Sequence, residues 1–228
     1  MAMTVLSPAP LRQARTIAGA ELRIEARAGE ALWIITPFGA VALLLTPMAV
    51  GADRPLLSQL GTGMYWVVVL LFGVLVALRQ TATDSPGHLA MLRMTGMPAA
   101  ARLGGRAAAT AVVLLAFETL LLPVMIALYQ PDLAGWAWLA AALPLTAAGL
   151  AALGTLAGAL VHGMAGRSTL GPLLVCPLAL PLLLGATELV EEGGYGQVPW
   201  LWLLLLVTVT GIGWLALLLG ANALEESS

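Results

Sequence analysis

The sequence predicts an all-α membrane protein with six transmembrane helices and with both termini in the cytoplasm. Three observations predict this fold class. Hydrophobic residues make up 60% of the 228 residues and charged residues only 10%, whereas soluble domains carry about 25% charged residues. The mean hydropathy is +0.95. Six mostly apolar stretches each have about 20 residues, the length that a helix needs to cross a hydrocarbon core of about 30 Å.

The six candidate spans lack the apolar and polar alternation of barrel strands, so helices are favoured. They run over Ala31–Gly51, Gln59–Leu78, Ala107–Tyr129, Trp136–Val161, Thr169–Leu189 and Trp200–Ala221. Prolines kink transmembrane helices rather than prevent them, and Pro177 and Pro181 are expected to kink the fifth span. Residues 1–30 then form a cytoplasmic arm, residues 31–221 the transmembrane domain and residues 222–228 a cytoplasmic tail.

The arginine distribution predicts the orientation of the spans. All ten basic residues are Arg. Nine of them fall in the N-terminal arm, in the connection between spans two and three that begins at Arg79, or in the loop between spans four and five, and Arg54 alone lies on the other side. Cytoplasmic loops carry the excess of positive residues in membrane proteins. Both termini are therefore expected in the cytoplasm.

The composition also excludes several classes of function. Without Lys there is neither a Walker A phosphate loop nor a Schiff-base lysine. The single cysteine excludes an intrachain disulfide, a zinc site made of Cys alone and a CxxCH haem attachment. The net charge of -2 gives no basic field for nucleic acid. We expect no enzymatic activity, no metal site and no directly bound cofactor.

An amphipathic helix is predicted within the N-terminal arm. Projected at 100° per residue, four arginines gather within a sector of about 120°, namely Arg12, Arg15, Arg23 and Arg27. Such a helix lies in the membrane plane with its arginines at the lipid headgroups. Glu21 and Glu25 fall within the apolar sector instead. They are expected either to pair with arginines of this arm or of a neighbouring element, or to face a protein partner.

A short helix is also predicted in the cytoplasmic loop 80–106, between spans two and three. Ser85 can cap a helix that Pro86 opens, and Gly96 followed by Pro98 ends it. A helix of this length is not stable alone in water, so its apolar side must dock on this bundle or on another protein. The candidate residues for docking a separate ATPase are Ser85, Gly87, His88, Leu89, Met91, Leu92 and Pro98.

Glu118 is an ionisable residue in the middle of the third span. Placing a charge at that depth costs at least ~2.5–3.5 kcal/mol on insertion scales. We therefore expect Glu118 to be protonated, or to face a polar cavity shared with Thr119, Thr146 or Thr155.

Gly154 and Gly158 form a GxxxG step in the fourth span. Small residues at this spacing let two helix backbones approach closely. The step is consistent with helix packing inside one chain and with a dimer contact, and both alternatives stay open at the level of the sequence.

At these features the chain resembles the CcmB family. The arm reads Glu21-Leu22-Arg23-Ile24-Glu25-Ala26-Arg27, which is similar to the acid-Leu-Arg-x-Glu-x-Arg elbow motif of that family. The loop segment from Gly87 to Leu92, followed by Pro98, looks like the Gly-x-Leu-Glu-x-Leu segment and its proline, although Ala90 replaces the usual glutamate. The twin prolines of span five match as well. The resemblance covers roughly Leu11 to Gly220.

The resemblance implies the permease subunit of the ABC transporter for cytochrome c maturation in the bacterial cytoplasmic membrane. Such a subunit couples ATP hydrolysis by a separate soluble P-loop ATPase to haem delivery or to the release of a haem-loaded chaperone. The implied partners are that ATPase, a second copy or a related membrane subunit, a haem-handling membrane subunit and the haem chaperone. Haem is then the transported or handled ligand. The alternatives are an ABC-2-type exporter permease for a lipid or drug and a non-transporting membrane scaffold.

Overall fold

The computed structural model describes residues 10–29, 31–51, 53–82, 98–131, 134–162 and 170–226, and its elements over these residues are helices. In chain order they are α1 (Pro10–Ala28), the short π-helix η1 (Ala31–Ile35), α2 (Thr36–Val50), α3 (Arg54–Ala82), α5 (Ala99–Tyr129), α6 (Trp136–His162), α7 (Leu170–Gly194) and α8 (Trp200–Glu226). Among the described residues, six helical segments are long and apolar enough to cross a membrane, which confirms the predicted number of spans.

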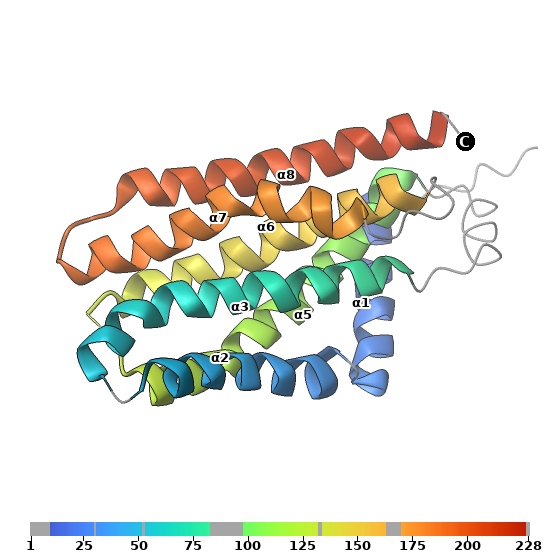
Figure 1. The fold of residues 1–228 in the computed structure, drawn as a ribbon. Coiled ribbons are helices and arrows are strands. Elements are labelled where there is room, and N and C mark those ends of the chain that lie inside the picture. Colours follow the sequence, from blue (N-terminus) through green and yellow to red (C-terminus); the bar gives the residue numbers. More distant parts are fainter. Residues whose placement is uncertain are drawn as a thin grey trace, which may run out of the picture.

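The six spans form one bundle, and α1 crosses it at one end (Figure 1). We call this end the α1 end; the last turns of α3 and the first turns of α5 lie there too. Burial separates a centre from a periphery. In the most apolar stretch of α6, 67% of the residues are buried. The corresponding share is 11% in the first span, which includes α2, and 22% in α8. α6 is therefore the central helix, and α2 and α8 present most of their surface to the surroundings of the bundle.

Helix α5 begins at Ala99, about two turns before the predicted start of the third span at Ala107. Pro98 has an extended backbone and precedes the first helical residue. The run of alanines from Ala99 to Ala101 then favours continued helix. Because α3 also runs on to Ala82, the connection between the two helices spans residues 83–98 rather than the predicted 80–106.

The surroundings of Gly154 show what this residue of the GxxxG step does. A Cβ atom added there would collide with the Cβ atom of Ala77 on α3. The missing side chain is thus needed for the close approach of α6 to α3 within one chain. Intramolecular packing, rather than a dimer contact, is what the structure shows for Gly154.

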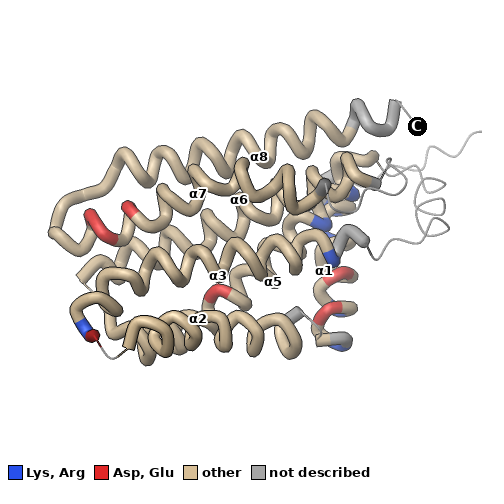
Figure 2. Tube along the Cα trace, in the orientation of Figure 1, with Lys and Arg blue, Asp and Glu red and all other residues tan. Residues whose placement is uncertain are grey.

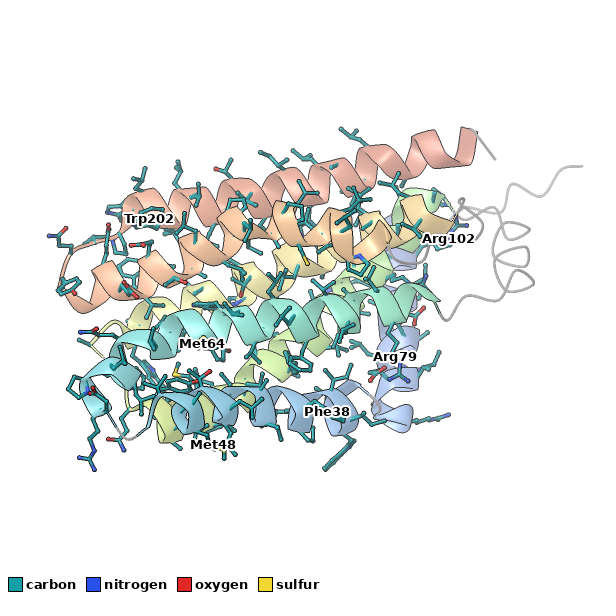
Figure 3. All side chains as sticks on the ribbon, viewed as in Figure 1. Phe38, Met48, Met64, Arg79, Arg102 and Trp202 are labelled. Atoms are coloured by element: carbon teal, nitrogen blue, oxygen red, sulfur yellow. The ribbon has the colours of Figure 1, made fainter. Side chains whose placement is uncertain are left out.

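Helix α2 packs on α5 and on α3. Gly39 and Leu43 are its buried residues, and the Tyr129 hydroxyl on α5 donates a hydrogen bond to the carbonyl oxygen of Leu43 at 2.8 Å. By contrast, Phe38 and Met48 project away from the bundle (Figure 3) and are 63% and 72% exposed. One narrow stripe of α2 therefore carries its packing.

Candidate functional site

The predicted elbow motif lies on α1, which packs on the first turns of α5. A Cβ atom added at Gly105 would lie 2.6 Å from the backbone oxygen of Ala14 and 3.0 Å from Cβ of Ile17. The two backbones can approach this closely only because α5 has a glycine at the crossing. The contact holds α1 across the bundle at the first turns of α5, which follow the connection from α3 in the sequence.

An ion pair reinforces this crossing. The Arg106 guanidinium donates to the Glu21 carboxylate with an Nη2–Oε1 distance of 3.4 Å. The side chain of Arg106 is 11% exposed and that of Glu21 is 29% exposed, so water screens the pair only partly. The sequence interpretation that Glu21 pairs with an arginine of a neighbouring element is confirmed.

The other elbow residues have different surroundings. Arg23 and Arg27 are exposed, while Glu25 is half-buried. The Gly29 backbone N–H donates to the Glu25 carbonyl at 2.6 Å. Gly29 has a φ of +62°, a left-handed conformation that glycine adopts without strain. The chain turns there from α1 into η1 and α2, so the elbow joins the arm to the first span.

The connection that carries the predicted ATPase-docking residues joins two helix ends at the α1 end. Figure 2 shows that charged positions gather toward the ends of the bundle, and Arg79 and Arg102 lie at the α1 end (Figure 3). Pro98 is exposed and directly precedes α5. The other predicted docking residues lie outside the described residues: Ser85, Gly87, His88, Leu89, Met91 and Leu92.

Glu118 lies midway along α5 and is fully buried. Thr146 Oγ1 on α6 lies 3.2 Å from Glu118 Oε2 and 3.3 Å from Oε1. On the other side, the Tyr65 hydroxyl on α3 donates to the backbone oxygen of Glu118 at 2.9 Å. Three helices therefore meet at this residue through polar contacts.

The contacts of Thr146 bear on the proton of Glu118. Thr146 Oγ1 also lies 2.8 Å from the carbonyl oxygen of Ala142 and 2.9 Å from that of Leu143. A hydroxyl has one proton to donate. If that proton goes to the Ala142 carbonyl in the preceding turn, the contact with Glu118 needs a proton on the carboxyl group. The arrangement suits a neutral glutamic acid that donates to Thr146.

The three threonines named for Glu118 are not brought together. Thr119 is exposed, and its hydroxyl donates to the Leu115 carbonyl at 2.7 Å, so it serves its own helix. Thr155 is fully buried further along α6, and within the described part of the chain its hydroxyl has no hydrogen-bond partner. Of these three threonines, Thr146 is the one that contacts the carboxyl group. The expectation that Thr119 or Thr155 shares a site with Glu118 has no support in these contacts.

Two residues of these sites were missed at the sequence level. In the sequence Arg106 is one of the arginines that indicate the orientation, and only the small residues just before it, Gly104 and Gly105, point to a close helix crossing. Tyr65 is buried in an apolar span, where its hydroxyl needs a partner. Tyr65 also lines a cleft that lies toward the end of the bundle opposite the α1 end. The residues that line this cleft are Thr62, Tyr65, Trp66, Leu122, Met125, Ile126, Pro131, Trp136, Leu139 and Val190.

The remaining predicted positions concern helix shape and metal binding. Pro177 and Pro181 both lie inside α7, which continues as a helix from Leu170 to Gly194; the kink stays a prediction. Over the residues that the structure describes, no group of three or more His, Cys, Asp or Glu side chains is placed to hold a metal ion.

Comparison with known proteins places these features in a family. The family model described as "CcmB protein" matches residues 12–226, from the first arginine of α1 to the last residue of α8. The chain belongs to the CcmB family. The match includes the elbow, the residues that join α3 to α5, and Glu118.

Two curated relatives agree with this assignment. The chain is 30% identical over 183 residues to heme exporter protein B of Rhodobacter capsulatus, which covers 80% of this chain and 84% of the relative. It is also 30% identical over 168 residues to heme exporter protein B of Haemophilus influenzae, covering 71% of this chain and 74% of the relative. The CcmB family resemblance predicted from the sequence is confirmed.

Proposed function

We propose that the chain is the permease subunit of an ABC transporter for cytochrome c maturation, and that it couples ATP hydrolysis by a separate ATPase to haem delivery or to release of a haem-loaded chaperone. Membership of the CcmB family over residues 12–226 carries this proposal. The names of the two relatives support haem as the handled substrate. The absence of Lys supports a partner as the site of nucleotide hydrolysis.

The α1 end is the cytoplasmic end in this proposal. The arginine excess on the segments that meet there supports the orientation, and α1 crosses the spans as a helix in the membrane plane would (Figure 1). Both termini are then cytoplasmic, and the bacterial relatives support the cytoplasmic membrane as the location.

The proposed coupling runs from residues 83–97 into α5. A soluble P-loop ATPase docks on the segment Ser85–Pro98, and Pro98 leads directly into α5. Through Gly105 and Arg106, α5 holds α1, and α1 continues through Gly29 into α2. A displacement of the first turns of α5 would therefore move α1 and the start of α2 with it. ATP binding biases the bundle only as far as the docked ATPase contacts its two states differently.

Haem is the cargo in this proposal, rather than a resident cofactor. A second copy or a related membrane subunit, a haem-handling membrane subunit and the haem chaperone complete the assembly. The chain supplies the moving helices, and the chemistry on the nucleotide and the contacts with haem belong to those partners.

Deletion and complementation test the proposed function. Deleting the gene should abolish mature c-type cytochromes, and the wild-type gene should restore them; normal cytochrome levels in the deletion strain would remove the haem assignment. A Leu89→Asp and Leu92→Asp double variant should be made in normal amount but lose co-purification of the ATPase, because two charges replace apolar docking side chains. An Ala100→Ser variant at the start of α5 is the matched control. Retained ATPase in the double variant would contradict the docking role.

A further inference from the structure

One face of α1 is not used by the bundle. It carries Arg12, Arg15, Arg23 and Arg27, which we call the arginine face. All four side chains are exposed. Among the residues that the structure describes, none of the four takes part in an ion pair or side-chain hydrogen bond. Four unshielded positive charges on one helix face, without an acid opposite them, are typical of a surface that binds an anionic partner.

Helix geometry gives the direction of this face. Arg12 and Glu21 are nine residues apart, which is about 2.5 turns of an α-helix, so they point in opposite directions. Arg23 is two residues beyond Glu21, about 200° around the helix. Because Glu21 faces Arg106 on α5 and Ala14 and Ile17 lie against Gly105, the arginine face points away from α5. It therefore faces sideways from the bundle.

We propose that the arginine face of α1 is a binding surface for the phosphate groups of anionic phospholipids. This inference rests on the proposed placement of α1 at the cytoplasmic membrane surface. There the sideways direction leads to the surrounding headgroups, and the guanidinium fork binds phosphate oxygens through two parallel hydrogen bonds. An acidic surface of the ATPase fits less well, since the ATPase approaches residues 83–97 from beyond the end of the bundle.

The arginine face gives α1 a second attachment, independent of α5. One side of the helix is fixed to the protein by Gly105 and by the Glu21–Arg106 pair. The opposite side binds lipid. The helix would thus keep its depth at the membrane surface when it moves together with the first turns of α5.

Boundary-lipid selection by the full chain tests the proposal. The protein is reconstituted in bilayers, and the association of spin-labelled phosphatidylglycerol is measured relative to spin-labelled phosphatidylcholine. The wild type should prefer phosphatidylglycerol. The quadruple variant with Arg12, Arg15, Arg23 and Arg27 replaced by Gln should lose that preference by at least about fivefold, the fold-change that about 1 kcal/mol from a single surface arginine corresponds to. The Arg54→Gln variant, which removes an exposed arginine at the other end of the bundle, should match the wild type.

Two results would overturn the proposal. One is an unchanged lipid preference in the quadruple variant, and the same variant losing the ATPase would then assign the face to that partner. The other comes from the wild type alone and does not depend on how the variant folds. Raising the salt from 0.1 to 1 M shortens the screening length from about 10 to about 3 Å, so a preference that survives in 1 M salt is not electrostatic. Neither measurement involves haem or ATP, so a failure here leaves the proposed transport function standing.

Discussion

The bundle accommodates two acids differently: Glu21, which contacts α5, and Glu118, which lies on α5. Glu21 lies at the α1 end, is partly exposed and faces the Arg106 guanidinium at 3.4 Å. Glu118 lies midway along α5, is fully buried and has the hydroxyl of Thr146 as the side-chain partner that the structure describes. At the α1 end an acid beside a cation ties a peripheral helix to the bundle. In the centre, the contacts of Thr146 suit a neutral acid that joins two helices without a charge.

The largest expected effect comes from forcing a charge onto the central site. Glu118→Lys replaces a carboxyl group that can be neutral with an ammonium group that has no acid nearby among the described residues. We expect a loss of more than about 3 kcal/mol of stability and little folded protein in the membrane. Glu118→Gln keeps the shape and can still donate to Thr146, so it should accumulate as the wild type does. Size-exclusion profiles of the detergent-extracted proteins compare the two.

Infrared spectroscopy separates the two acids directly. The wild type should show the carbonyl stretch of a neutral carboxylic acid that is missing in Glu118→Gln and present in Glu21→Gln. A carboxylate band that disappears in Glu118→Gln would show that the central acid is ionised, and the comparison drawn above would then fail.

The ion pair at the edge should give the next largest effect. Arg106→Ala leaves the Glu21 carboxylate at the crossing without its guanidinium, which should cost roughly 1.5–3 kcal/mol, the range for hydrogen bonds to charged groups. The melting temperature from tryptophan fluorescence measures this loss. Exchanging the two residues in a Glu21→Arg and Arg106→Glu double variant should recover part of it. If the exchange is as unstable as the sum of the single variants, the pair does not stabilise α1.

A smaller effect is expected from closing the space at the helix crossing. Gly105→Ala places a Cβ atom 2.6 Å from the backbone oxygen of Ala14. This clash is relieved only if one of the two helix backbones moves, which should lower the stability by about 1–3 kcal/mol. Gly104→Ala is the matched control, because its Cβ atom would meet only the flexible end of Leu218 at 3.4 Å. A disulfide trap between cysteines placed on α1 and α5 should form less readily in Gly105→Ala than in Gly104→Ala. Equal trapping would mean that the glycine is not needed for this contact.

The smallest expected difference lies between two buried threonines of α6. Thr146→Val removes the hydroxyl that contacts Glu118 and should lower the stability by about 0.5–1.5 kcal/mol. Thr155→Val removes a buried hydroxyl that has no partner in the described structure, so the stability should stay equal or rise. Thermal unfolding in the same detergent ranks the two variants. The opposite ranking would contradict the hydrogen bond between Thr146 and Glu118.

The spans were predictable because their signal is local. A helix that crosses the bilayer needs about 20 apolar residues in a row, and this requirement marks each span without knowledge of its neighbours. The ends of α5 were less predictable. The long apolar run stops near Ala107, but Ala99–Ala101 favour helix, so the helix continues back to Ala99 even though Gly104 and Gly105 are poor helix formers.

The partners of the acids could be predicted only as classes. The sequence indicates that Glu21 pairs with an arginine or faces a protein partner, and that Glu118 is protonated or has a polar neighbour. Which residue serves depends on how the helices pack, since Arg106 is 85 positions from Glu21 and Thr146 is 28 positions from Glu118. Thr119 adjoins Glu118 in the sequence, yet successive helical residues point about 100° apart. Thr119, the threonine nearest to Glu118 in the sequence, therefore lies on a different side of α5 from the Glu118 side chain.

The single stripe by which α2 is held also affects how the protein is made. α2 leaves the ribosome before the other spans, but the tyrosine that binds the Leu43 carbonyl follows 86 residues later. At a synthesis rate of about 5–20 residues per second, the wait is about 4–17 s. Until then the nascent helix can pack on α3 but not on α5, so most of its surface has to reside in lipid, a state for which the side chains that remain outward in the finished molecule are already suited.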